Sequence, residues 1–520
     1  MMGEAVMYII AIDSGTTGSR VGLFNEEGKP VAWCYREHTQ IYPHPGWVEH
    51  NPIEIWENVK YCIKEVIARS YVKPSEIVGI GVTNQRETVV AWNPKTGMVY
   101  GNALVWQDRR TVKYVEYLRE NYLEIIRAKT GLIPDPYFSS TKIWWMLDNI
   151  EGLRERAKRG EVIFGTIDTW IIWNLSRGSR ECLTPEFNGA FVTDYSNASR
   201  TMLFNIRRLE WDPELAEVQG MIPIESLPLT RPSVDRDFYG YTGSEVRSIL
   251  GSVEIPIAGD AGDQQAALFG QACFKEGDVK CTYGTGNFIL LNTGDDVTLS
   301  EHGLLTTVYY SDKPKSAYYA LEGSIFVTGA AIQWLRDGLK IIEVSAEVDP
   351  LAEAVQDTGG VYFVPAFTGL GAPYWDPYAR GLIIGITRDT TRKHIARAVL
   401  ESIAYLTRDV IEVMKLDARK EISKLKADGG ASKSNFLMQF QADILGIKVV
   451  RPVIYETTSL GVAFMAGLAT GIWRSLEELC RIWKAEKVFE PKMPLEERER
   501  LYGNWKAAVK RALNWAREVS

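Results

Sequence analysis

Short apolar runs alternate with amphipathic segments along the chain. Residues 7–13 (MYIIAID) and 21–25 (VGLFN) are apolar runs on either side of the polar turn SGTTGS, and comparable runs occupy residues 76–84, 88–93 and 103–107. Runs of this length, rich in β-branched and aromatic residues and bounded by Gly, Asn and Ser, predict β-strands.

Residues 51–70 have the pattern of an amphipathic helix. Asn51 suits the N-cap, Pro52 suits the first helical position, and Glu54 is placed for a capping box. The apolar positions that fall on one helical face are Ile55, Val59, Cys62, Ile63, Val66 and Ile67. Strands that alternate with such helices predict an α/β protein.

A second strand pair repeats the plan of the first. Residues 278–293 (DVKCTYGTGNFILLNT) match residues 11–25 (AIDSGTTGSRVGLFN) in having an apolar strand, a Gly/Thr turn and another apolar strand. This similarity predicts an internal duplication, with one domain over residues 1–252 and a second over residues 253–520. Glycines let a backbone approach closely, and loop N–H groups and Thr hydroxyls are donors to a polyanion, so the two turns predict phosphate clasps.

Composition narrows the possible functions. With 520 residues, 46% of them hydrophobic, and a net charge of -7, the chain has no general basic surface for nucleic acid or an anionic membrane. Its six cysteines include no C-x-x-C pair, which favours free thiols in a reducing compartment. The N-terminal residues 1–13 lack a basic region, so they do not resemble a secretory signal. The apolar residues 461–473 are too few to span a bilayer. We therefore expect a cytoplasmic protein without a membrane span.

The stretch AGDAGDQQAALFG, residues 258–270, raises a question of role. Asp263 lies just before an apolar run, as a helix N-cap does. From this stretch alone, a capping role is favoured over a catalytic one. Asp260 is assigned a structural role. The common nucleotide signatures do not settle the matter, since neither a complete P-loop nor a complete G-x-G-x-x-G motif is present.

Three polar clusters are further candidates for a binding site. Arg86 and Glu87 in TNQRET could clamp a hydroxylated ligand, or could form a surface ion pair. Trp106 in VWQDRRT could be a pocket wall or a core residue. In ADGGASKSNF, Gly429 and Gly430 could let a flat ring approach the backbone, or could simply form a turn before a helix.

Twelve segments, taken together, resemble one known family. They are IDSGTTGSR, PGWVEHNPIEIW, GVTNQRET, ALVWQDRRT, DPYFSSTK, FGTIDTWIIW, TDYSNASRTMLFNI, AGDAGDQQAALFGQ, TYGTGNF, ALEGSIFVTGAAIQWLRDG, VPAFTGLGAPYWDPYARG and ADGGASKSNFLMQFQADILG. In number and order they resemble the FGGY carbohydrate kinases, and among these the kinases that act on glycerol. The resemblance implies an α/β protein of two ribonuclease-H-like domains, of the actin and sugar-kinase superfamily, with a catalytic cleft between them. It also implies transfer of the γ-phosphoryl group of ATP to glycerol, which gives sn-glycerol 3-phosphate.

The resemblance also assigns residues and partners. Polyol contacts are implied for Arg86, Glu87, Tyr137, Asp263 and Gln264, with Trp106 and Phe288 as walls, and Asp263 as the general base. Nucleotide contacts are implied for Thr16, Thr17, Gly18, Arg20, Thr285, Gly329, Gln333 and Gly430, with Asp13 on the side of a Mg²⁺ ion. The expected cofactors are ATP and Mg²⁺, and the expected assembly is a homo-oligomer, a dimer or a tetramer.

Two alternatives stay open at this point. The first is an FGGY kinase for another polyol or a ketose; the co-occurrence of NQRET, WVEH and AGDQQ favours glycerol over it. The second is a filament former or chaperone ATPase of the same superfamily, which would need no pocket for a small alcohol. A substrate panel coupled to ADP release would distinguish glycerol from another polyol or a ketose. ATP turnover that is independent of glycerol, together with filament formation, would favour the second alternative.

Overall fold

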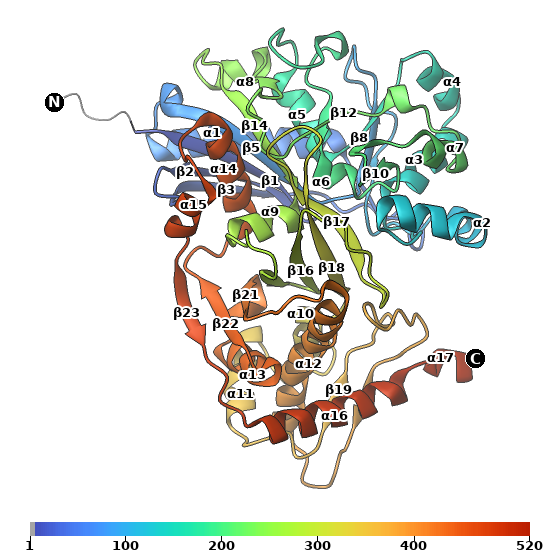
Figure 1. Cartoon of the computed structure of the whole chain (residues 1–520), viewed down its shortest axis with the longest axis vertical. Coiled ribbons are helices and arrows are strands. Elements are labelled where there is room, and N and C mark those ends of the chain that lie inside the picture. Colours follow the sequence, from blue (N-terminus) through green and yellow to red (C-terminus); the bar gives the residue numbers. More distant parts are fainter. Residues whose placement is uncertain (1–5, 520) are drawn as a thin grey trace, which may run out of the picture.

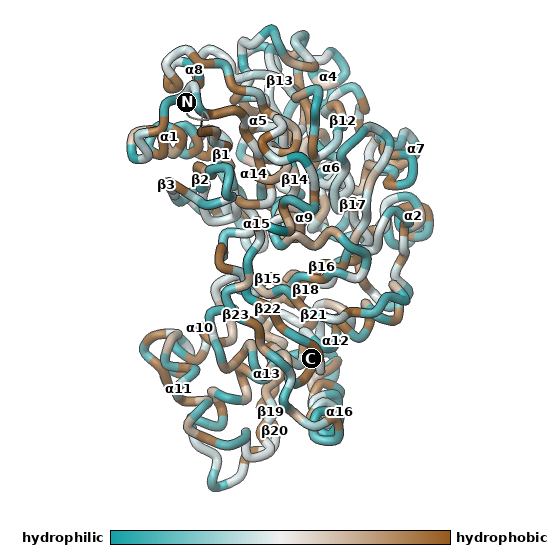
Figure 2. Tube along the Cα trace, turned by 60° about the vertical axis from the view of Figure 1, so that its left-hand side comes forward, coloured by the Kyte–Doolittle hydropathy of each residue, from teal (hydrophilic) through white to brown (hydrophobic). Residues whose placement is uncertain are grey.

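Two large mixed sheets organise the protein. The computed structural model describes residues 6–519, so the first five residues of the N-terminal segment considered above lie outside the described part. The first sheet has the strand order β13 (Gly240–Tyr241), β14 (Pro256–Gly262), β5 (Ile77–Asn84), β1 (Tyr8–Ser14), β2 (Gly18–Asn25) and β3 (Pro30–Glu37). The second has the order β17 (Leu305–Tyr310), β18 (Tyr318–Ile325), β16 (Asn287–Gly294), β15 (Val279–Tyr283), β21 (Lys424–Asp428), β22 (Lys448–Pro452) and β23 (Ala485–Phe489). In Figure 2 the strands of the first sheet lie in the upper part, and most strands of the second sheet, β15 to β23 apart from β17, lie below them.

Six strands of the second sheet repeat the topology of the first, and β17 extends the second sheet beyond β18. Each contains a hairpin, β1–β2 or β15–β16, whose second strand pairs antiparallel with a further strand, β3 or β18. On the other side each hairpin pairs in parallel with β5 or β21, then with β14 or β22, and the order ends in an antiparallel strand, β13 or β23. The duplication that the two Gly/Thr turns predicted is therefore present at the level of the whole sheet.

Helices complete the layers, and most lie between consecutive strands (Figure 1). The longer ones are α1 (Pro52–Ser70), α2 (Val112–Thr130), α3 (Ser139–Asn149), α5 (Ile167–Ser176), α9 (Asp263–Gly270), α10 (Gly329–Asp337), α12 (Arg392–Ala418), α13 (Asn435–Leu445), α14 (Thr457–Thr470) and α16 (Leu495–Ala512). The short ones are α4 (Leu153–Lys158), α6 (Tyr195–Ala198), α7 (Pro213–Val218), α8 (Ser244–Ile249), α11 (Val348–Glu353), α15 (Leu476–Ile482) and α17 (Trp515–Glu518). A four-stranded sheet consists of β4 (Glu49–His50), β7 (Ala103–Leu104), β6 (Val89–Trp92) and β8 (Ile163–Thr166). Further two-stranded pairings join β9 (Val192–Asp194) to β12 (Leu229–Arg231), β10 (Phe204–Asn205) to β11 (Glu210–Trp211), and β19 (Tyr362–Val364) to β20 (Leu382–Ile384).

The alternation of side chains along β1 explains how the first sheet is covered on both faces. Ile10 and Ile12 join the core formed with α1 and α5, whereas Ile9 and Ala11 join the core formed with α9 and α14. Both sets are fully buried because successive residues of a strand point to opposite faces. The second of these cores also contains Leu290 of β16, so α9 and α14 are shared between the two sheets.

Helix α1 confirms most of the predicted N-terminus. Asn51 is the N-cap and its side chain accepts a hydrogen bond from the backbone N–H of Ile53, with Pro52 in the first turn. The predicted capping box is wrong, because the carboxylate of Glu54 instead accepts from the backbone N–H and the hydroxyl of Thr39. The Glu54 side chain, which the local pattern assigned to the cap, thus forms a tertiary contact instead.

The chain passes from the first sheet to the second after α9. Strand β14, which follows the predicted boundary at residues 252 and 253, pairs in parallel with β5 of the first sheet. We therefore place the change of domain between α9 and β15. Helix α14 returns from the second half of the chain to pack on β14, β5 and β1.

Two predictions from composition concern the described residues directly. All six cysteines are free thiols. Within residues 6–519, no helix has the length and apolar character needed to cross a membrane.

Candidate active site

The first Gly/Thr turn joins β1 to β2. The backbone N–H of Gly15 donates to the carbonyl of Gly18 across the turn (2.9 Å), and Gly18 is the buried first residue of β2. Thr17 at the tip is exposed. The hydroxyl of Thr16 accepts a hydrogen bond from the indole N–H of Trp106 (2.9 Å). Trp106 is therefore half-buried beside this turn rather than enclosed in the core.

Three polar side chains that the sequence analysis did not single out hold the backbone of this turn through hydrogen bonds. Gln40 donates to the carbonyl of Thr16 (3.0 Å), and Gln85 donates to the carbonyl of Gly15 (3.3 Å). His50 joins the two amides, since its Nδ1 lies 3.1 Å from Nε2 of Gln85 and its Nε2 lies 2.8 Å from Oε1 of Gln40. An amide nitrogen can only donate, so Nδ1 accepts and Nε2 carries the proton. The network requires neutral His50, and burial lowers the pKa of this imidazole to about 4.

We expect this buried histidine to make the protein acid-sensitive. The folded-state pKa of His50 lies below its usual 6.5, so the stability it contributes is complete at high pH and is lost as pH falls below 6.5. Between pH 7 and pH 5 the loss is about 2 kcal/mol. Urea unfolding of the wild type and His50→Gln at both values measures it, and equal losses in the two proteins would contradict the assignment.

The second Gly/Thr turn joins β15 to β16 and is hydrogen-bonded to the first turn of α10. The N–H of Gly284 donates to the carbonyl of Gly286 (3.0 Å), while the carbonyl of Thr285 accepts from the N–H of Ala330 (3.1 Å). Gly329 donates to the carbonyl of Gly284 (3.1 Å), and a Cβ at Gly329 would collide with that carbonyl oxygen. The first turn of α10 thus rests directly on the turn, and Thr285 at its tip is exposed.

Two further predicted nucleotide residues are open to solvent. Gln333 is exposed on α10. Gly430 is exposed where β21 ends, and a Cβ there would meet nothing within 4 Å. The preceding Gly429, at φ +86°, packs on the backbone of Tyr283 at the second turn. Gly430 therefore has the open backbone that the approach of a flat ring requires.

Arg86 is the centre of the predicted polyol site. It lies in the turn between β5 and β6 and is 2% exposed. Its Nη1 and Nη2 bind Oε2 and Oε1 of Glu322 at 2.6 and 2.8 Å. Its Nε lies 3.2 Å from Oδ1 of Asp263 and 3.8 Å from Oε1 of Glu87, and its Nη2 donates to the hydroxyl of Tyr137 (3.2 Å). The fold thus brings together four residues that the sequence placed in one site.

Arg200 and Glu322 belong to the same network and were missed by sequence reasoning. Arg200, just after α6, donates from Nε to Oε1 of Glu87 (2.7 Å) and from Nη2 to Oε1 of Glu322 (3.2 Å). All three side chains are buried. Burial opposes ionisation, but Arg200 and Arg86 hold the pKa of Glu322 at about 2. In the sequence, the only sign of these two buried charges is that each stands among small and apolar residues, Arg200 in SNASRTMLF and Glu322 in ALEGSIF.

Asp263 begins α9 but is not its N-cap. Gly262 occupies the cap position, and Oδ1 of Asp263 accepts from the backbone N–H of Gln264 (2.8 Å). The N-cap interpretation is therefore wrong by one residue. Burial raises the pKa of the Asp263 carboxyl, while Arg86 and Lys280 oppose that rise. The side chain remains 28% exposed, so it can reach a ligand.

Gln264 and Phe288 come together through Lys280, another residue that was not predicted. The ammonium of Lys280 donates to Oε1 of Gln264 (2.5 Å), to the hydroxyl of Thr282 (2.9 Å) and to the carbonyl of Phe288 (3.4 Å). Lys280 is fully buried in β15, and Phe288 is half-buried in the facing strand β16. This second group of polyol candidates therefore comes from α9 and the second sheet.

Two aromatic rings border the Arg86 network. The rings of Trp106 and Tyr137 pack edge to face with their centroids 5.6 Å apart. Burial raises the pKa of the Tyr137 phenol, so its hydroxyl keeps its proton. The pair can offer apolar ring surface and one hydroxyl to a small ligand.

Asp13, at the end of β1, lies in a group of carboxylates. Burial, together with the charges of Asp263 and Glu456, raises the pKa of Asp13 to about 7, although Arg20 opposes the rise. Arg20, paired with Asp13 across the hairpin, forms an ion pair with Glu456 at the start of α14. Mg²⁺ prefers carboxylate oxygens, and the charges of Asp263 and Glu456 near Asp13 favour a cation there, so the residues present fit such an ion.

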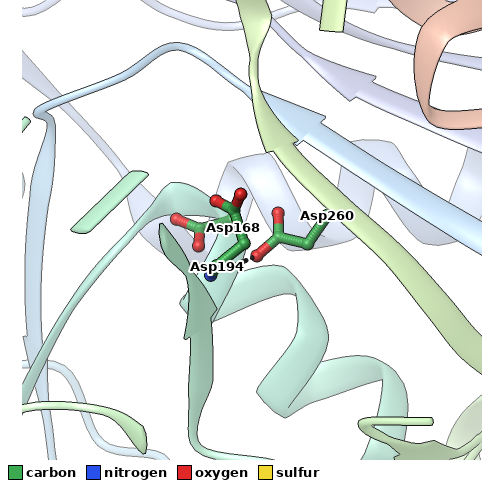
Figure 3. Close-up of side chains that lie close together, drawn as sticks. All are labelled: Asp168, Asp194 and Asp260. Carbon is green, nitrogen blue, oxygen red and sulfur yellow. Dashed lines mark hydrogen bonds between the residues drawn. The ribbon is translucent and has the colours of Figure 1, made fainter. Parts of the chain in front are cut away.

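Three further carboxyl groups form a separate buried cluster. Asp168 of α5, Asp194 at the end of β9 and Asp260 of β14 are all fully buried, with one oxygen of each within 4.8 Å of the others (Figure 3). The backbone N–H of Asp194 donates to Oδ2 of Asp260 (3.0 Å). Burial raises the pKa of Asp194 to about 6, and burial with the two neighbouring carboxylates raises that of Asp260 well above its usual value. Burial and the neighbouring carboxylates thus favour the protonated form of Asp260, which fits the structural role predicted for it.

Replacing Asp260 by its neutral isostere is expected to be tolerated, because burial and the neighbouring carboxylates favour its protonated form. Asp260→Asn keeps an acceptor for Asp194 and a donor for Asp168, so the free energy of unfolding falls by less than about 1 kcal/mol. Asp260→Leu leaves both partners unsatisfied and costs roughly 2–4 kcal/mol. Urea unfolding at pH 7 compares them, and equal losses would show that the cluster needs a charge at this position.

Sheets of one topology, each with a Gly/Thr hairpin, and a polar site built from both, define a two-domain α/β protein of the actin and sugar-kinase superfamily. The sequence pattern of the FGGY family of carbohydrate kinases matches along most of the chain, its N-terminal domain over residues 8–270 and its C-terminal domain over residues 279–470. The protein belongs to the FGGY family of carbohydrate kinases.

Similar proteins cover nearly the whole chain. Glycerol kinase 2 of Thermotoga maritima is 57% identical over 509 residues, 98% of this chain and 99% of that protein. Glycerol kinase 2 of Sulfolobus acidocaldarius is 58% identical over 515 residues, 99% of each chain. Among solved structures, Plasmodium falciparum glycerol kinase with ADP has a TM-score of 0.90 at 37% identity and 98% coverage of both chains. A xylulose kinase from Lactobacillus acidophilus, at 23% identity and a TM-score of 0.83, shares the fold.

Proposed function

We propose that this protein transfers the γ-phosphoryl group of ATP to a terminal hydroxyl of glycerol and releases sn-glycerol 3-phosphate. The observation that carries the proposal is the identity of 57–58% over nearly the whole chain to proteins named glycerol kinase. The group of Arg86, Glu87, Tyr137 and Asp263, in mutual contact, supports it because a triol needs several fixed donors and acceptors in a small volume.

In this proposal the polyol binds between the two polar groups described above. Arg86 donates to a glycerol hydroxyl, and Glu87 and Asp263 accept from others. Tyr137 and Gln264 add polar contacts, and Trp106 and Phe288 cover the carbon chain. An analogue that lacks a hydroxyl would leave a buried partner unsatisfied, which selects for the triol.

Asp263 is the proposed general base. A neutral alcohol is a poor nucleophile, so a carboxylate must accept its proton as the phosphoryl group is transferred. Burial raises the pKa of Asp263 and so strengthens it as a base. Its Oδ1 is contacted by Nε of Arg86 (3.2 Å) and by the backbone N–H of Gln264 (2.8 Å), which leaves Oδ2 for the hydroxyl.

The two hairpins are the proposed nucleotide site. Thr16, Thr17, Gly18 and Arg20 of the first turn and strand face the transferred phosphate, and Thr285 of the second turn holds the phosphates behind it. Gly329, Gln333 and Gly430 are the proposed contacts to the remainder of ATP. Asp13 would hold Mg²⁺, which when bound neutralises charge on the phosphates. Closure of the two domains would keep water away from the phosphoryl group.

The place and assembly of the enzyme are also proposals. An acidic chain with free thiols and no membrane-crossing helix within residues 6–519 fits a cytoplasmic enzyme. We infer a homo-oligomer, a dimer or a tetramer, from the resemblance to the FGGY kinases, and sedimentation velocity of the purified chain measures it.

ADP release coupled to a spectroscopic readout tests the function. Purified protein is given Mg²⁺ and ATP with glycerol, with longer polyols, or with the ketose xylulose, and we expect kcat/KM to be highest for glycerol. Preference for xylulose or a longer polyol would instead identify another FGGY kinase. ATP turnover that does not depend on any added alcohol would contradict kinase function altogether.

A further inference from the structure

Glu322 connects the two halves of the site. It lies on β18 in the second sheet, yet its carboxylate is bound by Arg86 and Arg200, which both come from the first half of the chain. Its side chain has no exposed surface, and all three contacts are between 2.6 and 3.2 Å. No other part of the proposed function explains a buried acid at this place.

The geometry of the contact restricts how Arg86 can be oriented. A carboxylate that binds both terminal nitrogens of a guanidinium fixes its plane, because the two N–H···O bonds are parallel. Glu322 binds Arg86 in this way, at 2.6 and 2.8 Å. Only Nε of Arg86 is left for Asp263, at 3.2 Å. Arg86 therefore cannot form a two-bonded ion pair with Asp263.

The charges lead to the same conclusion. Arg86 and Arg200 are balanced by Glu87 and Glu322 within one buried network. Asp263 is outside this balance and touches it at a single nitrogen. Without the charge of Glu322, Asp263 would become a main counter-ion of Arg86, and a carboxylate held in that way is less available to a substrate hydroxyl.

We infer that Glu322 is a positioning residue of the polyol site. From the second domain it holds Arg86 in one orientation toward glycerol and keeps Asp263 free to accept the proton of the reacting hydroxyl. The inference rests on the proposed function, because it gives Arg86 and Asp263 the roles proposed for them there.

Two variants separate the charge of Glu322 from its shape. Glu322→Gln keeps the size but removes the charge and one acceptor, and Glu322→Asp keeps the charge but shortens the reach by one methylene. We expect E322Q to lower kcat/KM for glycerol by roughly 10- to 100-fold, the equivalent of one charge-assisted contact. The KM for ATP should stay within about twofold, since no nucleotide residue touches Glu322. E322D should lie between E322Q and the wild type.

A matched control distinguishes positioning from a general loss of stability. Glu401 of α12 is a buried glutamate that forms an ion pair with Arg397 (2.9 Å) outside the site. Glu401→Gln should lower the melting temperature without changing the KM for glycerol. A double-mutant cycle with Arg86→Lys adds a second test. If Glu322 acts through Arg86, E322Q in that background changes kcat/KM for glycerol by no more than about twofold.

Wild-type kinetics with glycerol are measured first, and no phosphorylation there would contradict the proposed function. With an active wild type, E322Q that retains kcat/KM for glycerol within about twofold overturns the inference. Additive effects of E322Q and R86K also overturn it. If E322Q does not fold, E322D is taken through the same cycle and decides by the same criteria.

Discussion

Asp263→Asn is expected to lower kcat for glycerol phosphorylation by about 10²–10⁴-fold, the range of a general base in the transition state. Asparagine keeps the size of the side chain and an oxygen toward the N–H of Gln264, so the start of α9 is preserved. The KM for glycerol should change by only a few fold, because the lost interaction develops during proton transfer. Coupled release of ADP, with glycerol and ATP varied in turn, measures both parameters.

Asp260→Asn is the matched control for this experiment. It makes the same chemical change three residues earlier, in a fully buried carboxyl whose protonated form is favoured by burial and by Asp168 and Asp194. Its kcat should remain within a few fold of the wild type. A near-normal kcat for Asp263→Asn would reject Asp263 as the base, and the family assignment would be unaffected.

Arg86→Met is expected to damage both activity and stability. The arginine is 2% exposed and is the partner of Glu322, Glu87 and Asp263, so its removal leaves buried carboxylates without compensation. Loss of one member of a buried ion pair costs about 3–5 kcal/mol. The free energy of unfolding in urea should fall by that amount, and kcat/KM for glycerol should fall on the order of 10³-fold.

Two further variants show whether the effects of Arg86→Met come from the loss of its charge within the site. In Arg86→Met/Glu322→Met neither partner of the closest pair is left charged, so part of the stability should return although activity does not. Arg397→Met removes an arginine that pairs with Glu401 outside the site, and it should change stability alone. If Arg86→Met unfolds as the wild type does, the neighbouring carboxylates do not depend on its charge.

Local signals in the sequence were sufficient for several elements of the fold and the site. The helix beginning at Pro52 and the two Gly/Thr hairpins follow from spacing and turn chemistry, which act between residues close along the chain. The repeat of one hairpin also indicated that the second sheet copies the first. Resemblance to the FGGY kinases then named the polyol residues, of which Arg86, Glu87, Tyr137 and Asp263 do lie together.

Contacts between distant segments explain where local pattern failed. Glu54 accepts hydrogen bonds from Thr39 instead of forming a capping box, and the N-cap of α9 is Gly262 rather than Asp263. Strand β14 joins the first sheet because its parallel partner is β5, far earlier in the chain. A helix-capping interaction is worth only about 1 kcal/mol, so tertiary packing readily overrides it.

By itself the sequence determined the α/β class, the duplicated hairpins and the residue types available for a polyol and a phosphate. Only the tertiary structure decided which charges meet, because ion pairs such as Arg86 with Glu322 join segments that no periodicity relates. The same holds for the hydrogen bonds from His50 that hold the side chains under the first turn, and for the grouping of Asp260 with Asp168 and Asp194. Burial makes these choices decisive, since an unpaired charge inside the protein costs far more than one in water.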